Sequence, residues 1–183
     1  MQAICITCGT QFADGATRPA ACPICQDERQ YVNWNGQQWT SLADLQVRHR
    51  NVLRDVEPGM IGIATEPSFA IGQRALLVQT PAGNVLWDCI SLIDQATIDA
   101  VTALGGIQAI AISHPHFYSA MVEWSRAFDA PIHLHEDNRP FVMRPDPAIA
   151  YWAGETLPLM PGVTLIRCGG HFPGSTVMHW ADG

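Results

Sequence analysis

The sequence predicts an α/β layered domain that follows a small cysteine-rich segment, and two observations support this interpretation. From Val52 onward, short apolar runs typical of buried strands alternate with segments whose apolar residues have helical spacing. Residues 1–29 hold four of the six cysteines but few large apolar side chains, so this segment needs disulfides or a bound metal to stay folded. We therefore divide the chain into three parts, 1–29, 30–51 and 52–183.

The cysteines of the first part form two C-x2-C pairs, Cys5/Cys8 and Cys22/Cys25, with 13 residues between the pairs. Each pair presents two thiolates on one side of a turn, and four thiolates suit the tetrahedral geometry of structural zinc. Four unrelated reduced thiols, or two disulfides in a secreted protein, are the alternatives. The first residues do not have the pattern of a signal peptide, which favours the cytoplasm and metal binding. We predict a zinc ribbon over residues 1–29, with Zn²⁺ in a closed, structural site.

The second part, residues 30–51, is predicted to be a hairpin and short helix that link the ribbon to the main domain. Asn35-Gly36 lies between segments that carry aromatic residues, which is a strong signal for a tight hairpin turn. Ser41 and Asp44 resemble a weak capping box for a helix that ends near Arg48.

The third part contains strands and helices in alternation. Helices are expected at residues 92–104 and 119–128, and strands at residues 75–78, 85–87, 107–112, 132–135, 163–166 and 175–180. Residues 137–162 contain five prolines and are expected to be an irregular connector. The last strand runs into Asp182-Gly183, a turn that normally leads to a returning strand. We therefore expect the domain at 52–183 to be incomplete and the chain to be a fragment. The alternative is that the last strand is an open edge strand.

Three histidines follow predicted strands. His114 and His116 come directly after the buried strand at 107–112, and side chains two positions apart on an extended segment point the same way. His171 lies in a loop held by glycines and a proline between the last two strands. Ligand sites are common at the carboxyl ends of strands in α/β folds, so the three imidazoles are candidate metal ligands. The alternative is an ordinary strand end and a hydrogen-bonded loop histidine.

The order of these elements and motifs resembles the metallo-β-lactamase superfamily. That family carries a first motif T/S-H-x-H-x-D-H and a later loop G-H-T-P-G-S, and this chain has S-H-P-H-F-Y-S at 113–119 and G-H-F-P-G-S at 170–175. The resemblance covers residues 52–183 and implies an αββα sandwich, mainly its N-terminal half. It also implies that His114, His116 and His171 bind Zn²⁺ or another transition metal.

The departures from the family pattern concern the second metal. Tyr118 stands where the family has aspartate, and Ser119 where it has histidine. The resemblance therefore implies one intact three-histidine site and a damaged or absent second site, with the family's remaining ligands expected beyond Gly183. Tyr118 is a poor base at neutral pH but a possible hydrogen-bond donor in catalysis, and Ser119 is expected to cap the next helix. Asp88, like the family's aspartate after the corresponding strand, is expected to accept a hydrogen bond from a ligand imidazole.

A second H-x-H pair, His133 and His135, also ends a predicted strand. In the family this strand lies beside the site without supplying ligands, so we assign both histidines a structural or pocket-lining role and keep His135 as a reserve ligand. The two remaining cysteines are assigned no chemistry.

Charge and hydropathy limit the partners. The net charge of −7 disfavours a nucleic-acid partner, and the chain has neither a basic amphipathic stretch nor an apolar run long enough for a membrane. A small-molecule substrate is expected, and a homodimer is left open. The leading interpretation is a metal-dependent hydrolase-like enzyme acting on an ester, thioester, amide or lactone carbonyl. The alternative is a catalytically inactive pseudoenzyme that serves as a binding module.

Overall fold

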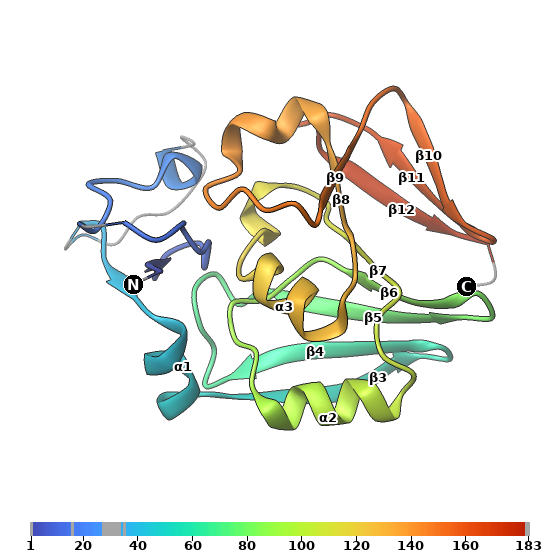
Figure 1. The fold of residues 1–183 in the computed structure, drawn as a ribbon, viewed down its shortest axis with the longest axis horizontal. Helices are drawn as coiled ribbons and strands as arrows, with labels where there is room; N and C mark the ends of the chain where they lie inside the picture. Colours follow the sequence, from blue (N-terminus) through green and yellow to red (C-terminus); the bar gives the residue numbers. More distant parts are fainter. Residues whose placement is uncertain (1, 16, 27–33, 35, 182–183) are drawn as a thin grey trace.

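A seven-stranded mixed sheet forms the centre of the molecule (Figure 1). The computed structural model describes residues 2–15, 17–26, 34 and 36–181. The strands, in their order across the sheet, are β3 (Arg50–Glu57), β4 (Met60–Glu66), β5 (Arg74–Thr80), β6 (Gly83–Trp87), β7 (Ala109–Ala111), β8 (Ile132–His135) and β9 (Ile149–Trp152). Strands β3 to β6 form an antiparallel meander, and β6 to β9 are parallel.

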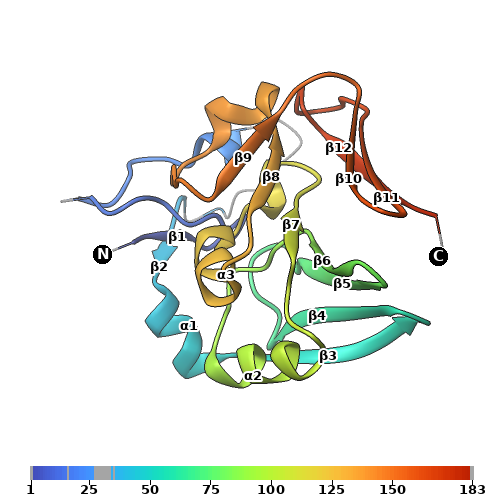
Figure 2. The same ribbon diagram turned by 45° about the vertical axis from the view of Figure 1, so that its right-hand side comes forward.

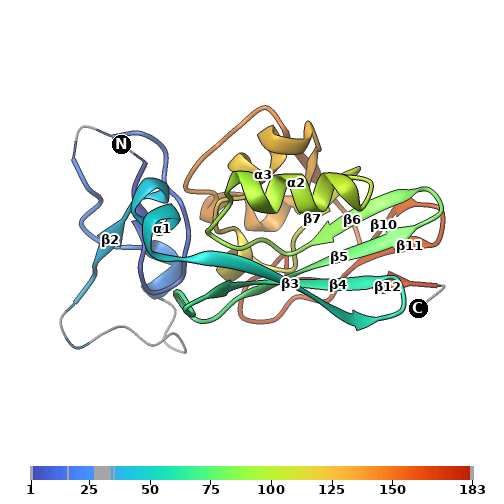
Figure 3. The same ribbon diagram turned by 90° about the horizontal axis from the view of Figure 1, so that it is seen from below.

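Two helices supply the first two of the three crossovers between the parallel strands. Helix α2 (Gln95–Ala103) connects β6 to β7, and α3 (Met121–Phe128) connects β7 to β8. Both lie on one face of the sheet (Figure 3), where a single apolar core includes Leu77, Ile110 and Trp124. The helices predicted at 92–104 and 119–128 are thus confirmed, with shorter bounds.

A second sheet covers part of the opposite face of the first one (Figure 2). It consists of β10 (Thr156–Met160), β11 (Val163–Arg167) and β12 (Thr176–Trp180), all antiparallel. Val163 and Leu165 of this sheet pack against Val85 and Ala111 of the central one. The result is a helix–sheet–sheet stack, which agrees with the predicted α/β sandwich. Among the described strands, β12 stands at the edge of its sheet.

The cysteine-rich segment lies beside one end of the central sheet (Figures 1 and 3). It contains β1 (Ile4–Cys5), which pairs with β2 (Trp39–Thr40), and the short 3-10 helix η1 (Pro23–Gln26). Helix α1 (Leu42–Arg48) follows, and Ser41 Oγ accepts a hydrogen bond from the Asp44 amide, so the predicted cap is confirmed. The predicted hairpin turn falls largely on residues 31–33 and 35, which lie outside the described residues.

The expectation of an irregular connector over 137–162 is wrong. This stretch holds the 3-10 helix η3 (Glu136–Phe141) and the strands β9 and β10. Its prolines are compatible with these elements because Pro140 lies in a short 3-10 helix and Pro158 in an edge strand. None of the helices in the described part of the chain has both the length and the hydrophobicity to cross a bilayer.

Trp124 is expected to be the most costly single truncation in the main core. Its side chain is 0% exposed, and its Nε1 donates a hydrogen bond to the Ile90 carbonyl at 3.0 Å. Trp124→Ala should lower the free energy of unfolding by about 3–5 kcal/mol, measured by urea denaturation. Trp34, which is 95% exposed, is the matched control. Trp34→Ala should change this free energy by less than about 0.5 kcal/mol.

Candidate metal centre

The turn that carries His114 and His116 begins where β7 ends. The Ser113 amide donates a hydrogen bond to Asp88 Oδ1 at 2.7 Å, and Ser113 Oγ lies 2.9 Å from His114 Nδ1. His114 has extended backbone angles, and a 3-10 turn, η2 (Pro115–Phe117), follows it. The contact at Nδ1 leaves Nε2 of His114 as the nitrogen available to a metal.

His171 is brought to this turn by the loop that joins β11 to β12. Gly169 and Gly170 have φ values of 66° and 132°, which L side chains rarely adopt. The Gly174 amide donates to Asn138 Oδ1 at 2.9 Å, and a Cβ at Gly174 would lie 2.9 Å from the Asn138 side chain. Asn138, on η3, thus holds this loop, and nothing in its sequence context singled it out. At the start of β12, the Thr176 amide donates to the Ser113 carbonyl at 2.8 Å, which joins the two histidine-bearing loops.

The three predicted imidazoles converge. One nitrogen from each of His114, His116 and His171 lies within 4.8 Å of the others. His171 Nε2 and His116 Nδ1 are 3.1 Å apart. Two nitrogens bound to one zinc ion in a tetrahedron are expected to lie about 3.3 Å apart, which is similar. The geometry therefore fits a single metal ion with three nitrogen ligands.

The environment of the site favours a neutral imidazole at His114. Burial, followed by the charges of His116 and His171, lowers the pKa of His114 to about 4. A lowered pKa keeps His114 neutral at pH 7, which is the form that binds a metal.

Asp88 supports the site in a different way from the one expected. Its carboxylate accepts a hydrogen bond from the Ser113 amide, so it holds the backbone in front of His114 instead of a ligand imidazole. Burial raises the pKa of Asp88 to about 6, although the hydrogen bonds from Ser113 oppose this shift. Its φ of 64° marks a sharp bend of the chain after β6. Asp88 thus fixes the backbone of Ser113, whose hydroxyl contacts His114.

The two positions that depart from the family pattern are both buried. Tyr118 is 1% exposed and packs in the main core, and burial raises the pKa of its phenol far above the ordinary value. Its predicted catalytic role stays a prediction, and this burial weighs against it. Ser119 has a φ of 41° and does not cap α3, whose N-cap residue is Ala120. The predicted capping role of Ser119 is therefore wrong.

His135, of the second H-x-H pair, is engaged elsewhere. His135 Nε2 lies 3.0 Å from the Gly154 carbonyl oxygen, and its Nδ1 accepts a hydrogen bond from the Asp137 amide at 3.2 Å. Both ring nitrogens have protein partners, which supports the structural role and removes the reason to keep His135 as a reserve ligand.

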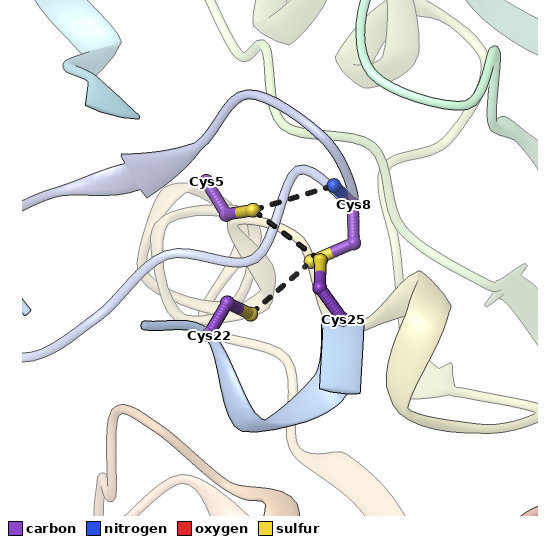
Figure 4. A group of neighbouring side chains, drawn as sticks. All are labelled: Cys5, Cys8, Cys22 and Cys25. Atoms are coloured by element: carbon purple, nitrogen blue, oxygen red, sulfur yellow. Dashed lines mark hydrogen bonds between the residues drawn. The ribbon is translucent and has the colours of Figure 1, made fainter. Parts of the chain in front are cut away.

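The four N-terminal cysteines form a second cluster (Figure 4). All four are buried, and their sulfurs lie within 4.8 Å of one another. Cys5 Sγ lies 3.6 Å from Cys25 Sγ, and Cys8 Sγ lies 3.6 Å from Cys22 Sγ, against about 3.8 Å in a tetrahedron with bonds of roughly 2.3 Å. Hydrogen bonds within the cluster lower the pKa of Cys5 and Cys8 and raise the pKa of Cys22 and Cys25, so the four thiols share their protons until a metal displaces them. The cluster fits one zinc ion.

Comparisons with known proteins agree with this architecture. No family model matches the chain. The DIM-1 metallo-β-lactamase structure superposes with a TM-score of 0.60 at 11% identity, over 73% of this chain and 66% of that one. A Cronobacter sakazakii metallo-β-lactamase with a HARLDQ motif gives a TM-score of 0.52 at 21% identity, over 76% and 62% of the two chains.

The chain has the metallo-β-lactamase fold. A structure of TTHA1623 in a di-iron-bound form also shares this fold, with a TM-score of 0.52 at 23% identity over 62% of this chain and 64% of that one. In sequence, the chain is 52% identical over 182 residues to the uncharacterized protein YmaE of Bacillus subtilis strain 168. The match covers 98% of this chain and 66% of YmaE, so the chain spans 66% of that relative's length.

Proposed function

We propose that this protein is a metal-dependent hydrolase with one metal ion held by His114, His116 and His171. The observation that supports the proposal is the convergence of these imidazoles beyond the carboxyl end of β7, in a fold shared with metallo-β-lactamases. A bound transition metal would lower the pKa of a coordinated water to about 7 and polarise a carbonyl group. The substrate class is a small molecule with an ester, thioester, amide or lactone carbonyl.

The residues of the chain have separate roles in this proposal. The three imidazoles bind the metal in their neutral form, which the lowered pKa of His114 favours. Asp88 fixes the Ser113 amide, and Ser113 Oγ orients the His114 ring through Nδ1. Asn138 holds the backbone of the loop that carries His171. Three protein ligands leave a coordination position open for water or substrate.

A second candidate function is a metal-containing binding module without catalysis. The specific observation in its favour is that Tyr118 and Ser119 replace the family's second-metal ligands and are both buried. The family's aspartate at this position also orients the attacking water, and neither replacement is a good base at neutral pH.

Metal content and hydrolysis measured on the same preparation separate these functions. We expect two metal ions per chain by mass spectrometry, one for each cluster, and hydrolysis of at least one substrate in a panel of the four carbonyl classes. Treatment with 1,10-phenanthroline should abolish the activity, and added Zn²⁺ should restore it. Two ions without hydrolysis of any class would favour the binding module. A single ion per chain, retained by the cysteines, would overturn the three-histidine site.

A further inference from the structure

One buried amide joins the two metal-ligand clusters. Gln73, directly before β5, is 7% exposed, and its Nε2 donates to the Cys8 carbonyl at 2.6 Å and to the His116 carbonyl at 3.0 Å. Cys8 belongs to the cysteine cluster and His116 to the histidine cluster. A single side chain therefore fixes the backbone of one ligand from each cluster.

The residues after Cys8 make two further contacts with the site loops. Ser91 Oγ donates a hydrogen bond to the Gly9 carbonyl at 2.8 Å. A Cβ at Gly9 would lie 2.3 Å from Ser91 Oγ. Only glycine fits this approach, and its φ of 77° also favours glycine. The Gln11 backbone amide donates a hydrogen bond to the Ser119 carbonyl at 3.0 Å. The ribbon thus contacts the chain just after Asp88 and just after the His116 turn.

The third site loop meets the ribbon through an apolar contact. Phe172, the neighbour of His171, is 2% exposed and packs in the same core cluster as Cys5, Cys8 and Cys22. Its ring centroid lies 4.5 Å from that of His171 and 5.2 Å from that of His116. Unfolding of the ribbon would therefore remove the apolar contacts that hold Phe172 and, with it, the His171 loop.

We propose that the four-cysteine ribbon is a positioning element of the three-histidine site, and that Gln73 is the residue that couples the two. A metal ion bound by the cysteines fixes the Cys8 carbonyl, Gln73 holds the His116 carbonyl against it, and the histidine site binds its own metal more tightly as a result. This inference rests on the proposed metal binding at both clusters. Because coupling between sites is reciprocal, metal at the histidines also strengthens binding at the cysteines.

The chain offers a matched control for Gln73. Asn84 is also 7% exposed, and its Nδ2 also donates to two backbone carbonyls, those of Leu104 and Gly106, each at 2.9 Å. These carbonyls lie between α2 and β7, before the strand, whereas His114 follows the other end of β7. Gln73→Met and Asn84→Leu each remove a buried amide of similar size. The first leaves two buried carbonyls without that donor and the second two half-buried ones, so both variants should lose stability.

The test is a Co²⁺ titration of the 183-residue chain after its cysteine cluster has been filled with Zn²⁺. Visible bands of Co²⁺ with nitrogen ligands report on the histidine site, and the absence of thiolate-to-cobalt bands verifies that Zn²⁺ stays with the cysteines. We expect Gln73→Met to weaken Co²⁺ binding at the histidines by about 10-fold, as is typical when a residue that orients metal ligands is lost. Asn84→Leu should leave this affinity within about twofold of the wild type. Thermal melts followed by circular dichroism establish that both variants fold.

A double-mutant cycle tests whether the effect of Gln73 passes through the ribbon. Cys22→Ser should also weaken Co²⁺ binding at the histidines, and adding Gln73→Met to it should cost less than the two single changes together. The coupling would be overturned if Gln73→Met and Asn84→Leu lowered the Co²⁺ affinity of the histidine site equally. It would also be overturned if the losses of Co²⁺ affinity in the cycle were additive. Wild-type protein that binds no Co²⁺ at the histidines would overturn the proposed function itself, a result distinct from loss of coupling alone.

Discussion

Replacing His116 by alanine is expected to lower the metal content from two ions per chain to one and to reduce hydrolysis by roughly 100-fold or more. Loss of a residue that merely orients a ligand typically costs 10–100-fold, so loss of a ligand should cost at least as much. The fold should be retained, because His116 lies in a short 3-10 turn and not in a core strand. The checks are metal analysis by mass spectrometry and steady-state kinetics on any substrate that the wild type hydrolyses.

His179 supplies the control for this prediction. It lies on the edge strand β12 and is exposed to solvent. His179→Ala should leave both metal content and hydrolysis unchanged. If His116→Ala kept two ions per chain and full activity, the three imidazoles would not form the functional centre, however close they lie.

Replacing Cys22 by serine is expected to remove the ion from the ribbon and to lower the free energy of unfolding by at least about 5 kcal/mol. Structural zinc contributes about 10–16 kcal/mol of apparent binding free energy, and three remaining ligands cannot close the tetrahedron. In a domain of this size the loss corresponds to roughly 10–20 °C in Tm. Differential scanning calorimetry and metal analysis measure the two effects.

The contacts of the ribbon determine how far this damage spreads. The packing of Phe172 on the cysteine cluster and the bond from Gln11 to Ser119 extend the effect to the histidine-bearing loops. Hydrogen exchange should therefore become faster in residues 116–119 and 169–175 as well as in the ribbon.

Cys168 allows a matched control, because it is also a cysteine but has an exposed thiol outside the cluster. Cys168→Ser should retain both ions and the wild-type Tm. Faster exchange confined to residues 2–26 in Cys22→Ser would contradict the contacts between the ribbon and the site loops.

Elements specified by local chemistry were predictable from the sequence. The Ser41 cap and the end of α2 near Gly105-Gly106 depend on neighbouring residues only, so their patterns are visible in a short window. The two H-x-H pairs and the C-x2-C pairs are also local, and the expected convergence of the first pair with His171 is confirmed.

Elements specified by distant partners were not predicted. Strand β3 has mainly half-buried or exposed side chains because it is the edge strand of the central sheet, so it shows no clear apolar run. Strands β9 and β10 lie in a proline-containing stretch and owe their conformation to pairing with β8 and β11. The role of Gln73 could not be anticipated, because a glutamine before a strand gives no sign of the two carbonyls that it will contact.

The contact between the ribbon and the rest of the molecule also has a consequence for protein synthesis. The cysteines are translated first, but the Ser119 carbonyl, which accepts a hydrogen bond from the Gln11 backbone amide, is made 94 residues after Cys25, and Phe172 is made later still. At about 5–20 residues per second, the nascent ribbon waits roughly 5–20 s for the first of these partners. During this interval the four thiols are not yet shielded by the sandwich, so capture of zinc on the ribosome would protect them from oxidation. The chain that emerges afterwards would then fold against a ribbon that is already rigid.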